Sequence, residues 1–71
     1  MLLTFEGKQI PIEDECLAEY RQTTGMDIDS TTYIPYCASN EGVSYKDMTV
    51  GELGAMVKRM MTAEIEIAKG L

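Results

Sequence analysis

The clearest element of the sequence lies between residues 49 and 70, which read TVGELGAMVKRMMTAEIEIAKG. Thr49 and Glu52 have the spacing of a capping box, in which each side chain bonds a free backbone N–H at the start of a helix. Apolar residues then recur every three or four positions, as on one face of an α-helix. They are Leu53, Val57, Met60, Met61, Ile65 and Ala68. With Gly70 as its stop, the pattern predicts a helix from about residue 50 to about residue 69.

This helix would be roughly 30 Å long at 1.5 Å per residue, which is long for a chain of 71 residues. Its apolar stripe therefore has two interpretations. It can form the core of one chain, or it can serve as a self-association face between two copies. The residues assigned to that face are Leu53, Val57, Met60, Met61 and Ile65.

The first twelve residues predict a β-hairpin, because apolar residues alternate with others on both sides of Gly7. A two-residue turn at Gly7 and Lys8 would place Phe5 opposite Ile10. The apolar face of the hairpin would then consist of Leu3, Phe5, Ile10 and Ile12.

A first helix is predicted over residues 12–24, with acidic residues in its first turn and Gly25 as its stop. Residues 27–47 are rich in β-formers but are interrupted by Pro35, which favours a short edge strand or an ordered loop. The turn residues at positions 40–42 suggest a second hairpin there. The predicted architecture is α+β in a single small domain over residues 1–71: an N-terminal β-hairpin, a helix, a short irregular β/loop segment and a long C-terminal amphipathic helix.

Composition limits the partners and the compartment. The formal net charge is −6, which disfavours nucleic acid and anionic membranes as partners, since both are polyanions. No stretch resembles a signal peptide or approaches the roughly 18 apolar residues of a membrane span. We therefore expect a cytoplasmic protein with reduced thiols. A bridge between Cys16 and Cys37 stays open, because their separation is not readable from the sequence.

The sequence offers no recognisable catalytic or metal site. The chain has no histidine, so neither Ser-His nor Cys-His nucleophile pairs can form within it. Two cysteines are too few for an iron–sulfur cluster, and the glycines match no phosphate-binding motif. The segment from Asp27 begins like a calcium loop but has Thr32 and Ala38 where such a loop needs glycine and glutamate. No catalytic residue, metal or cofactor is predicted, and we do not expect an enzyme.

Two groups of residues are candidates for contact with a partner. Tyrosine is enriched at binding surfaces because its ring buries area while its hydroxyl still forms hydrogen bonds. The tyrosines in the irregular segment are Tyr33, Tyr36 and Tyr45. The alternative is that these rings cover a thin core. The acidic residues of the first helix could dock a basic partner, or they could simply form a solvated helix start. They are Glu13, Asp14, Glu15 and Glu19.

By elimination, we expect a small acidic protein-binding factor that occupies a surface of a larger protein. Inhibitors and adaptors encoded by phages or mobile elements belong to this class. Two alternatives come from other classes: a homo-oligomer that sequesters a small ligand where its copies meet, and a structural subunit of a larger assembly. The expected partner is thus another protein, a second copy of the chain or a small ligand.

Overall fold

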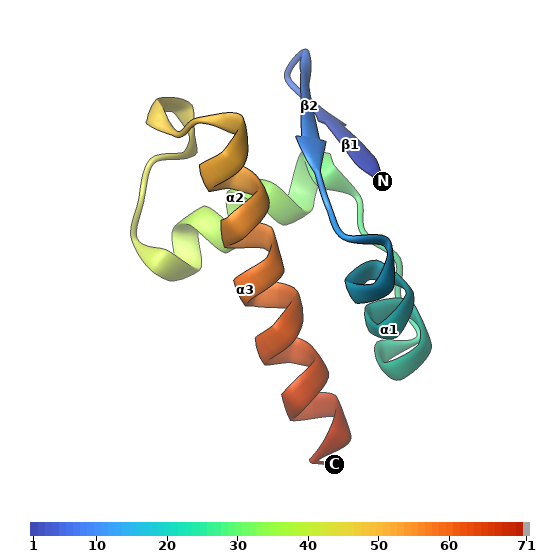
Figure 1. The fold of residues 1–71 in the computed structure, drawn as a ribbon. Helices are drawn as coiled ribbons and strands as arrows, with labels where there is room; N and C mark the ends of the chain where they lie inside the picture. Colours follow the sequence, from blue (N-terminus) through green and yellow to red (C-terminus); the bar gives the residue numbers. More distant parts are fainter. Residues whose placement is uncertain (71) are drawn as a thin grey trace.

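The computed structural model describes residues 1–70 and has an α+β fold that is mostly helical (Figure 1). An N-terminal antiparallel hairpin is followed by three helices. In chain order the elements are β1 (Leu2–Phe5), β2 (Lys8–Pro11), α1 (Asp14–Thr24), α2 (Ser30–Glu41), a 3-10 turn η1 (Tyr45–Asp47) and α3 (Val50–Lys69). The predicted class, the N-terminal hairpin and the long C-terminal helix are confirmed.

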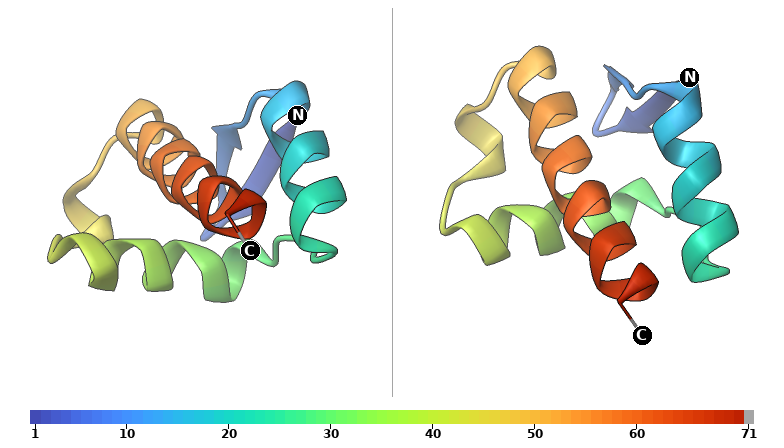
Figure 2. Two further views of the ribbon diagram at one scale, coloured as in Figure 1. Left: turned by 90° about the horizontal axis from the view of Figure 1, so that it is seen from below. Right: turned by 60° about the horizontal axis from the view of Figure 1, so that its bottom comes forward.

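Helix α3 forms as predicted, and the other elements pack around it (Figure 2). The capping box is present, with the Glu52 N–H donating to Thr49 Oγ1 at 3.1 Å and the Thr49 N–H donating to Glu52 Oε1 at 2.8 Å. One side of the helix is buried along most of its length. The buried residues are Leu53, Gly54, Met56, Val57, Met60, Met61 and Ile65. They meet apolar residues from the hairpin, α1 and α2 in one hydrophobic core.

The hairpin presents the predicted face to this core, but with a different turn. All four predicted apolar residues are buried, whereas the turn is formed by Glu6 and Gly7 and pairs Phe5 with Lys8. Both turn residues have positive φ, 49° and 78°, as in the type I′ turns whose twist matches that of a hairpin. The pairing is therefore displaced by two residues from the prediction. A displacement of two keeps every side chain on its expected face, because side chains alternate with a period of two.

Helix α1 begins two residues later than predicted. The Ile12 N–H donates to the Met1 carbonyl oxygen at 2.8 Å, and the Ile12 carbonyl oxygen accepts from the N-terminal ammonium at 2.9 Å. Residue 12 therefore continues the hairpin ladder, and α1 begins at Asp14. Gly25 ends α1 as expected, with a φ of 73°. Helices α1 and α3 lie side by side and run in the same direction, away from the hairpin (Figures 1 and 2). Ion pairs of Lys58 with Glu13 and of Lys69 with Glu19, at 2.7 and 2.9 Å, link them.

The strand or loop predicted within residues 27–47 is wrong, because residues 30–41 form helix α2. The Asp29 side chain caps its start by accepting from the Thr31 N–H at 3.1 Å. Pro35 lies inside the helix and cannot donate to the carbonyl of Thr31, but Thr31 is exposed, so water can bond that oxygen. The predicted turn at residues 40–42 is the end of this helix, where Gly42 has a φ of 68°.

Burial explains why a segment rich in β-formers becomes a helix. In helical geometry α2 places four residues on one side, where they pack into the core; they are Tyr33, Ile34, Cys37 and Ala38. A strand would have directed neighbouring residues to opposite faces. Tertiary packing therefore outweighs the local preference of the segment, as β-propensity scales allow.

Gly54 permits a close approach of helix α3 to strand β2, and its substitution provides a test. A Cβ atom at this position would lie 2.7 Å from the Pro11 carbonyl oxygen of β2. We expect Gly54→Ala to lower the free energy of unfolding by about 1–3 kcal/mol, as overpacking typically does. Gly51→Ala is the matched control, since the nearest atom there is Thr49 Oγ1 at 4.0 Å. It should leave stability unchanged or raise it by up to about 1 kcal/mol. Urea unfolding followed by circular dichroism measures both, and equal effects would contradict the steric role of Gly54.

Candidate functional site

The stripe assigned to self-association lies in the core of the folded chain. Its five residues are all buried; they are Leu53, Val57, Met60, Met61 and Ile65. They contact the hairpin, α1 and α2 within the same hydrophobic cluster. A second copy could not reach them without opening that core. The length of α3 is accommodated because three elements share its buried side.

The predicted acidic patch lies at the start of α1 and along the side of α1 that borders α3. Glu13 and Glu19 each pair with a lysine of α3, and Asp14 lies 2.6 Å from the N-terminal ammonium. Glu15 is exposed and lines a hollow of about 240 Å³ between α1 and α3. Three of the four carboxylates therefore already face a cation of their own chain. The field that they present to a partner is weaker than their number suggests.

The three candidate tyrosines do not form one surface. Tyr33 is buried, and its hydroxyl donates to Glu64 Oε1 on α3 at 2.5 Å. Tyr45 lies in η1 and packs edge-on against Phe5, with ring centroids 5.3 Å apart. Tyr36 has half of its side chain exposed, and its ring centroid is 5.9 Å from that of Tyr33. The tyrosine best placed for contact with another molecule is Tyr36.

Tyr36 borders a hollow of about 440 Å³ with largely apolar walls, which we call the Tyr36 groove. Its apolar wall residues are Tyr36, Met26, Ile67 and Ala68, and its polar wall residues are Thr23, Thr24 and Glu64. The end of α1 with the turn after it, helix α2 and the end of α3 each supply part of the wall. Met26 and Ile67 have exposed fractions of 53% and 64%. Single exposed apolar side chains are common on protein surfaces, but these two border the same hollow as Tyr36.

Met26 and Ile67 are surface residues that the sequence patterns did not predict. Ile67 is an apolar residue between Glu66 and Ala68 that does not belong to the buried stripe of α3. An apolar side chain off the stripe of an amphipathic helix is the signal that could have identified it. No comparable signal exists for Met26, because the position of its side chain depends on the path of the turn after α1.

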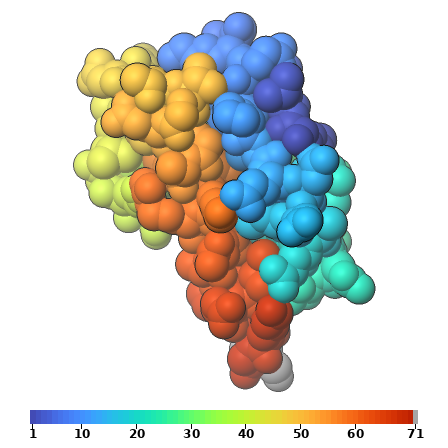
Figure 3. Space-filling view, in the orientation of Figure 1, coloured from blue at the N-terminus to red at the C-terminus, as the bar shows by residue number. Residues whose placement is uncertain are grey.

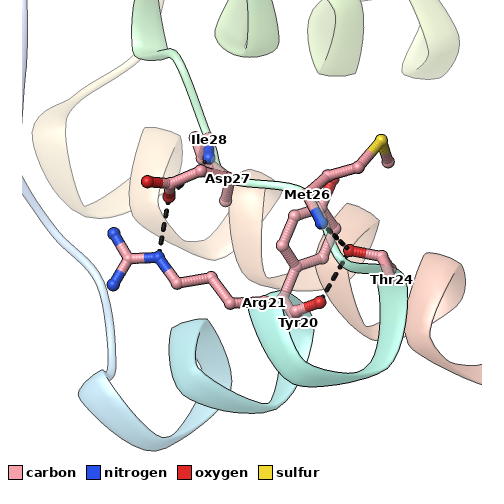
Figure 4. Close-up of polar contacts among 6 residues, drawn as sticks. All are labelled: Tyr20, Arg21, Thr24, Met26, Asp27 and Ile28. Atoms are coloured by element: carbon pink, nitrogen blue, oxygen red, sulfur yellow. Dashed lines mark hydrogen bonds and ion pairs between the residues drawn. The ribbon is translucent and has the colours of Figure 1, made fainter.

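Hydrogen bonds within that turn fix the position of Met26 (Figure 4). The Met26 N–H donates to Thr24 Oγ1 at 3.2 Å, and the Thr24 hydroxyl donates to the Tyr20 carbonyl oxygen at 2.7 Å. Arg21 Nε donates to Asp27 Oδ1 at 2.7 Å. This bond, together with the one from the Ile28 N–H, lowers the pKa of the Asp27 carboxyl. The Met26 side chain leaves the turn on the side away from Arg21 and Asp27 (Figure 4).

Glu64 is a carboxylate on the wall of this apolar groove. Its side chain is half-buried, and Oε1 accepts the hydrogen bond from the Tyr33 hydroxyl. Burial is the main cause that raises the pKa of Tyr33, and the hydrogen bond to the Glu64 carboxylate raises it further. The Tyr33 hydroxyl therefore remains a donor at physiological pH. Within residues 1–70 the other oxygen, Oε2, accepts no hydrogen bond from the chain.

Within the described part of the chain, the hollow on the outward side of α3 has none of the exposed large apolar side chains that border the Tyr36 groove. The outward side of α3 is uncovered (Figure 3), and small and charged residues line its hollow, including Ala55, Lys58 and Arg59. Both cations are in ion pairs, Lys58 with Glu13 and Arg59 with Glu41. Among residues 1–70 no group of three acidic or cysteine side chains is arranged to hold a metal ion, and no helix has the length and apolar character needed to cross a membrane.

The two cysteines are free thiols in poor environments for nucleophilic chemistry. Cys16 is partly exposed between α1 and α3, where burial and the nearby Glu13 raise its pKa. Cys37 is fully buried in α2, and burial, followed by the charges of Glu64 and Glu41, raises its pKa to about 12. Because the thiolate is the reactive form, neither position favours a nucleophile at neutral pH.

Alkylation of the native protein by iodoacetamide should therefore distinguish the two cysteines. At pH 8 we expect Cys16 to react slowly and Cys37 to react only when the domain unfolds, because Cys37 is both buried and protonated. Mass spectrometry of digested samples gives the rate at each site. Addition of urea should make the two rates similar, which serves as the control. Equal rates in the native protein would contradict the burial of Cys37.

No family model matches the sequence, and no curated protein or solved structure is significantly similar to it. A candidate function must therefore come from the arrangement of the chain's own residues. In that arrangement the Tyr36 groove is where exposed apolar side chains, a hollow and a half-buried carboxylate occur together.

Proposed function

We propose that this protein acts by binding another protein through the Tyr36 groove. One observation carries the proposal. Of the six large apolar side chains that are exposed within residues 1–70, three border this one hollow: Met26, Tyr36 and Ile67. Scattered exposed apolar residues are ordinary, whereas their concentration around a hollow is typical of an interaction site.

The chemistry of these side chains fits a protein partner. A tyrosine ring offers apolar area together with a hydroxyl, and methionine adapts its shape to an irregular surface. The partner would insert one apolar side chain or more into the hollow, and the rim would exclude water from the contact. By occupying a surface on a larger protein, the chain would act as an inhibitor or adaptor, of the kind that phages and mobile elements encode.

Charge has a secondary role in this proposal. The net charge of −6 would attract a basic partner and repel nucleic acid. Glu13, Asp14 and Glu19 contribute less to this attraction than their charges alone imply, because they face cations of their own chain. Glu15 contributes more, because within residues 1–70 it forms no ion pair. We expect the acidic residues to affect the rate of association, and the groove to affect how long the complex lasts.

Two alternatives are a homo-oligomer that sequesters a small ligand and a structural subunit of a larger assembly. Either one needs a contact surface other than the apolar stripe of α3, because that stripe is buried within one chain.

Affinity capture with matched surface variants tests the proposal. Ile67→Ser removes an exposed apolar side chain from the groove, and Leu2→Ser, on the hairpin, removes one that is 59% exposed and lies outside it. Both variants should stay within about 0.5 kcal/mol of the native stability, as exposed substitutions usually do. Immobilised wild-type protein and both variants would be incubated with an extract of the source cells, and the bound proteins quantified by mass spectrometry.

We expect at least one captured protein to fall by about tenfold or more with Ile67→Ser and to be retained with Leu2→Ser. The same captured set for all three proteins would show that the groove is not the binding surface. Light scattering of the free chain accompanies the capture. A dimer that Ile67→Ser dissociates would assign the groove to self-association instead.

A further inference from the structure

We infer that the Tyr36 groove takes an apolar protein segment that carries a lysine or arginine, whose cation pairs with Glu64. This inference rests on the proposed function and specifies the chemistry of the partner. It depends on the position of one carboxylate among apolar wall residues and on the absence of a cation from its own chain to pair with it.

Glu64 lies on the groove wall, where one of its carboxylate oxygens accepts a hydrogen bond and the other is free to accept one from a ligand. The hydroxyl of the buried Tyr33 donates to Oε1, and this hydrogen bond orients the carboxylate from the core side. Oε2 accepts no hydrogen bond from the side chains or backbone of residues 1–70. The neighbours along the wall are Met26, Tyr36, Ile67 and Ala68, which offer Glu64 no charge.

Within the described residues, no lysine or arginine forms an ion pair with Glu64. Four of the six lysine and arginine side chains pair with other carboxylates, at 2.7 to 2.9 Å. Arg21 is the one in the turn beside the groove, and its guanidinium faces Asp27 on the side of the turn away from Met26 (Figure 4). The remaining two, Lys8 and Lys46, lie in the hairpin and in η1. Within residues 1–70, Glu64 therefore has no lysine or arginine as an ion-pair partner.

This arrangement selects the partner on thermodynamic grounds. A wholly apolar segment that covered the groove would remove water from Glu64 and leave a buried charge without a counterion, which is strongly unfavourable. A segment with a lysine or arginine beside its apolar side chains would restore the lost interaction by a charge-assisted hydrogen bond to Oε2. Tyr36 adds a ring face on which the cation or its alkyl stem could rest.

Selection from a library of displayed random 12-residue peptides tests the inference. The wild-type protein serves as bait, and enriched peptides are synthesised and measured by fluorescence anisotropy. We expect the groove-binding peptides, defined by loss of binding to Ile67→Ser, to share a lysine or arginine next to leucine, isoleucine, methionine or phenylalanine. Replacing that cation by glutamine in the peptide should weaken binding by about tenfold or more.

Glu64→Gln should weaken the binding of the same peptides by a similar factor. The glutamine peptide should bind the Glu64→Gln variant only slightly more weakly than either single change allows, as expected for two groups that contact each other. Glutamine keeps an oxygen that can accept from Tyr33, so the fold should survive. Glu66→Gln is the matched control, because it removes the same charge from α3 at an exposed position outside the groove. Its effect should stay below about twofold, as expected for an exposed charge.

The outcomes separate the inference from the proposed function. Peptides that depend on Ile67 but carry no cation, or that bind Glu64→Gln as well as the wild type, overturn the inference and leave the groove as a binding site. A selection that yields no peptide dependent on Ile67 overturns the proposed function as well. Should Glu64→Gln fail to fold, the glutamine peptide measured on the wild-type protein decides the question alone. Binding that is unchanged by that replacement counts against the inference.

Discussion

The backbone contact between α3 and β2 is the constraint on which the rest of this structure depends. At Gly54 the absence of a side chain lets the helix lie against the Pro11 carbonyl. Leu53 and Val57 of α3 and Ile10 of β2 are fully buried and belong to the same hydrophobic core. Once α3 is fixed against the hairpin, α1 and α2 have a common surface to cover. A small domain has little core to spare, so a loss at this contact would affect every element.

Sequence patterns predicted the elements that form by local rules and missed the one that does not. The capping box at Thr49 and the stop at Gly25 act within a few residues, so both helix ends could be located. The segment containing Pro35 is rich in β-formers, and it forms a helix because its buried side packs into the core against α3. No short-range pattern encodes that fit. The hairpin turn was misplaced because two adjacent glycine-containing turns satisfy the same alternation.

The candidate site was predicted only in part, for a related reason. Tyr36 was identified from its chemistry, which the sequence states directly. The stripe of α3 was ambiguous between core and interface, because periodicity shows that a face is apolar but not what covers it. Met26 and Ile67 are far apart in the chain and meet Tyr36 only after folding. Glu64 acquires its position through Tyr33, a contact across 31 residues.

The Tyr36 groove is built from the end of α1, from α2 and from the end of α3, so it exists only while all three are docked. An occupant would bind the native chain and not the unfolded one, and would stabilise it by mass action. For a domain of marginal stability, the lifetime of a molecule in the cell would therefore depend on whether it is bound to a partner. Molecules engaged with a partner would resist proteolysis, whereas surplus molecules would unfold more often and be degraded. The cellular level of this protein would then follow the level of its partner without any dedicated regulator.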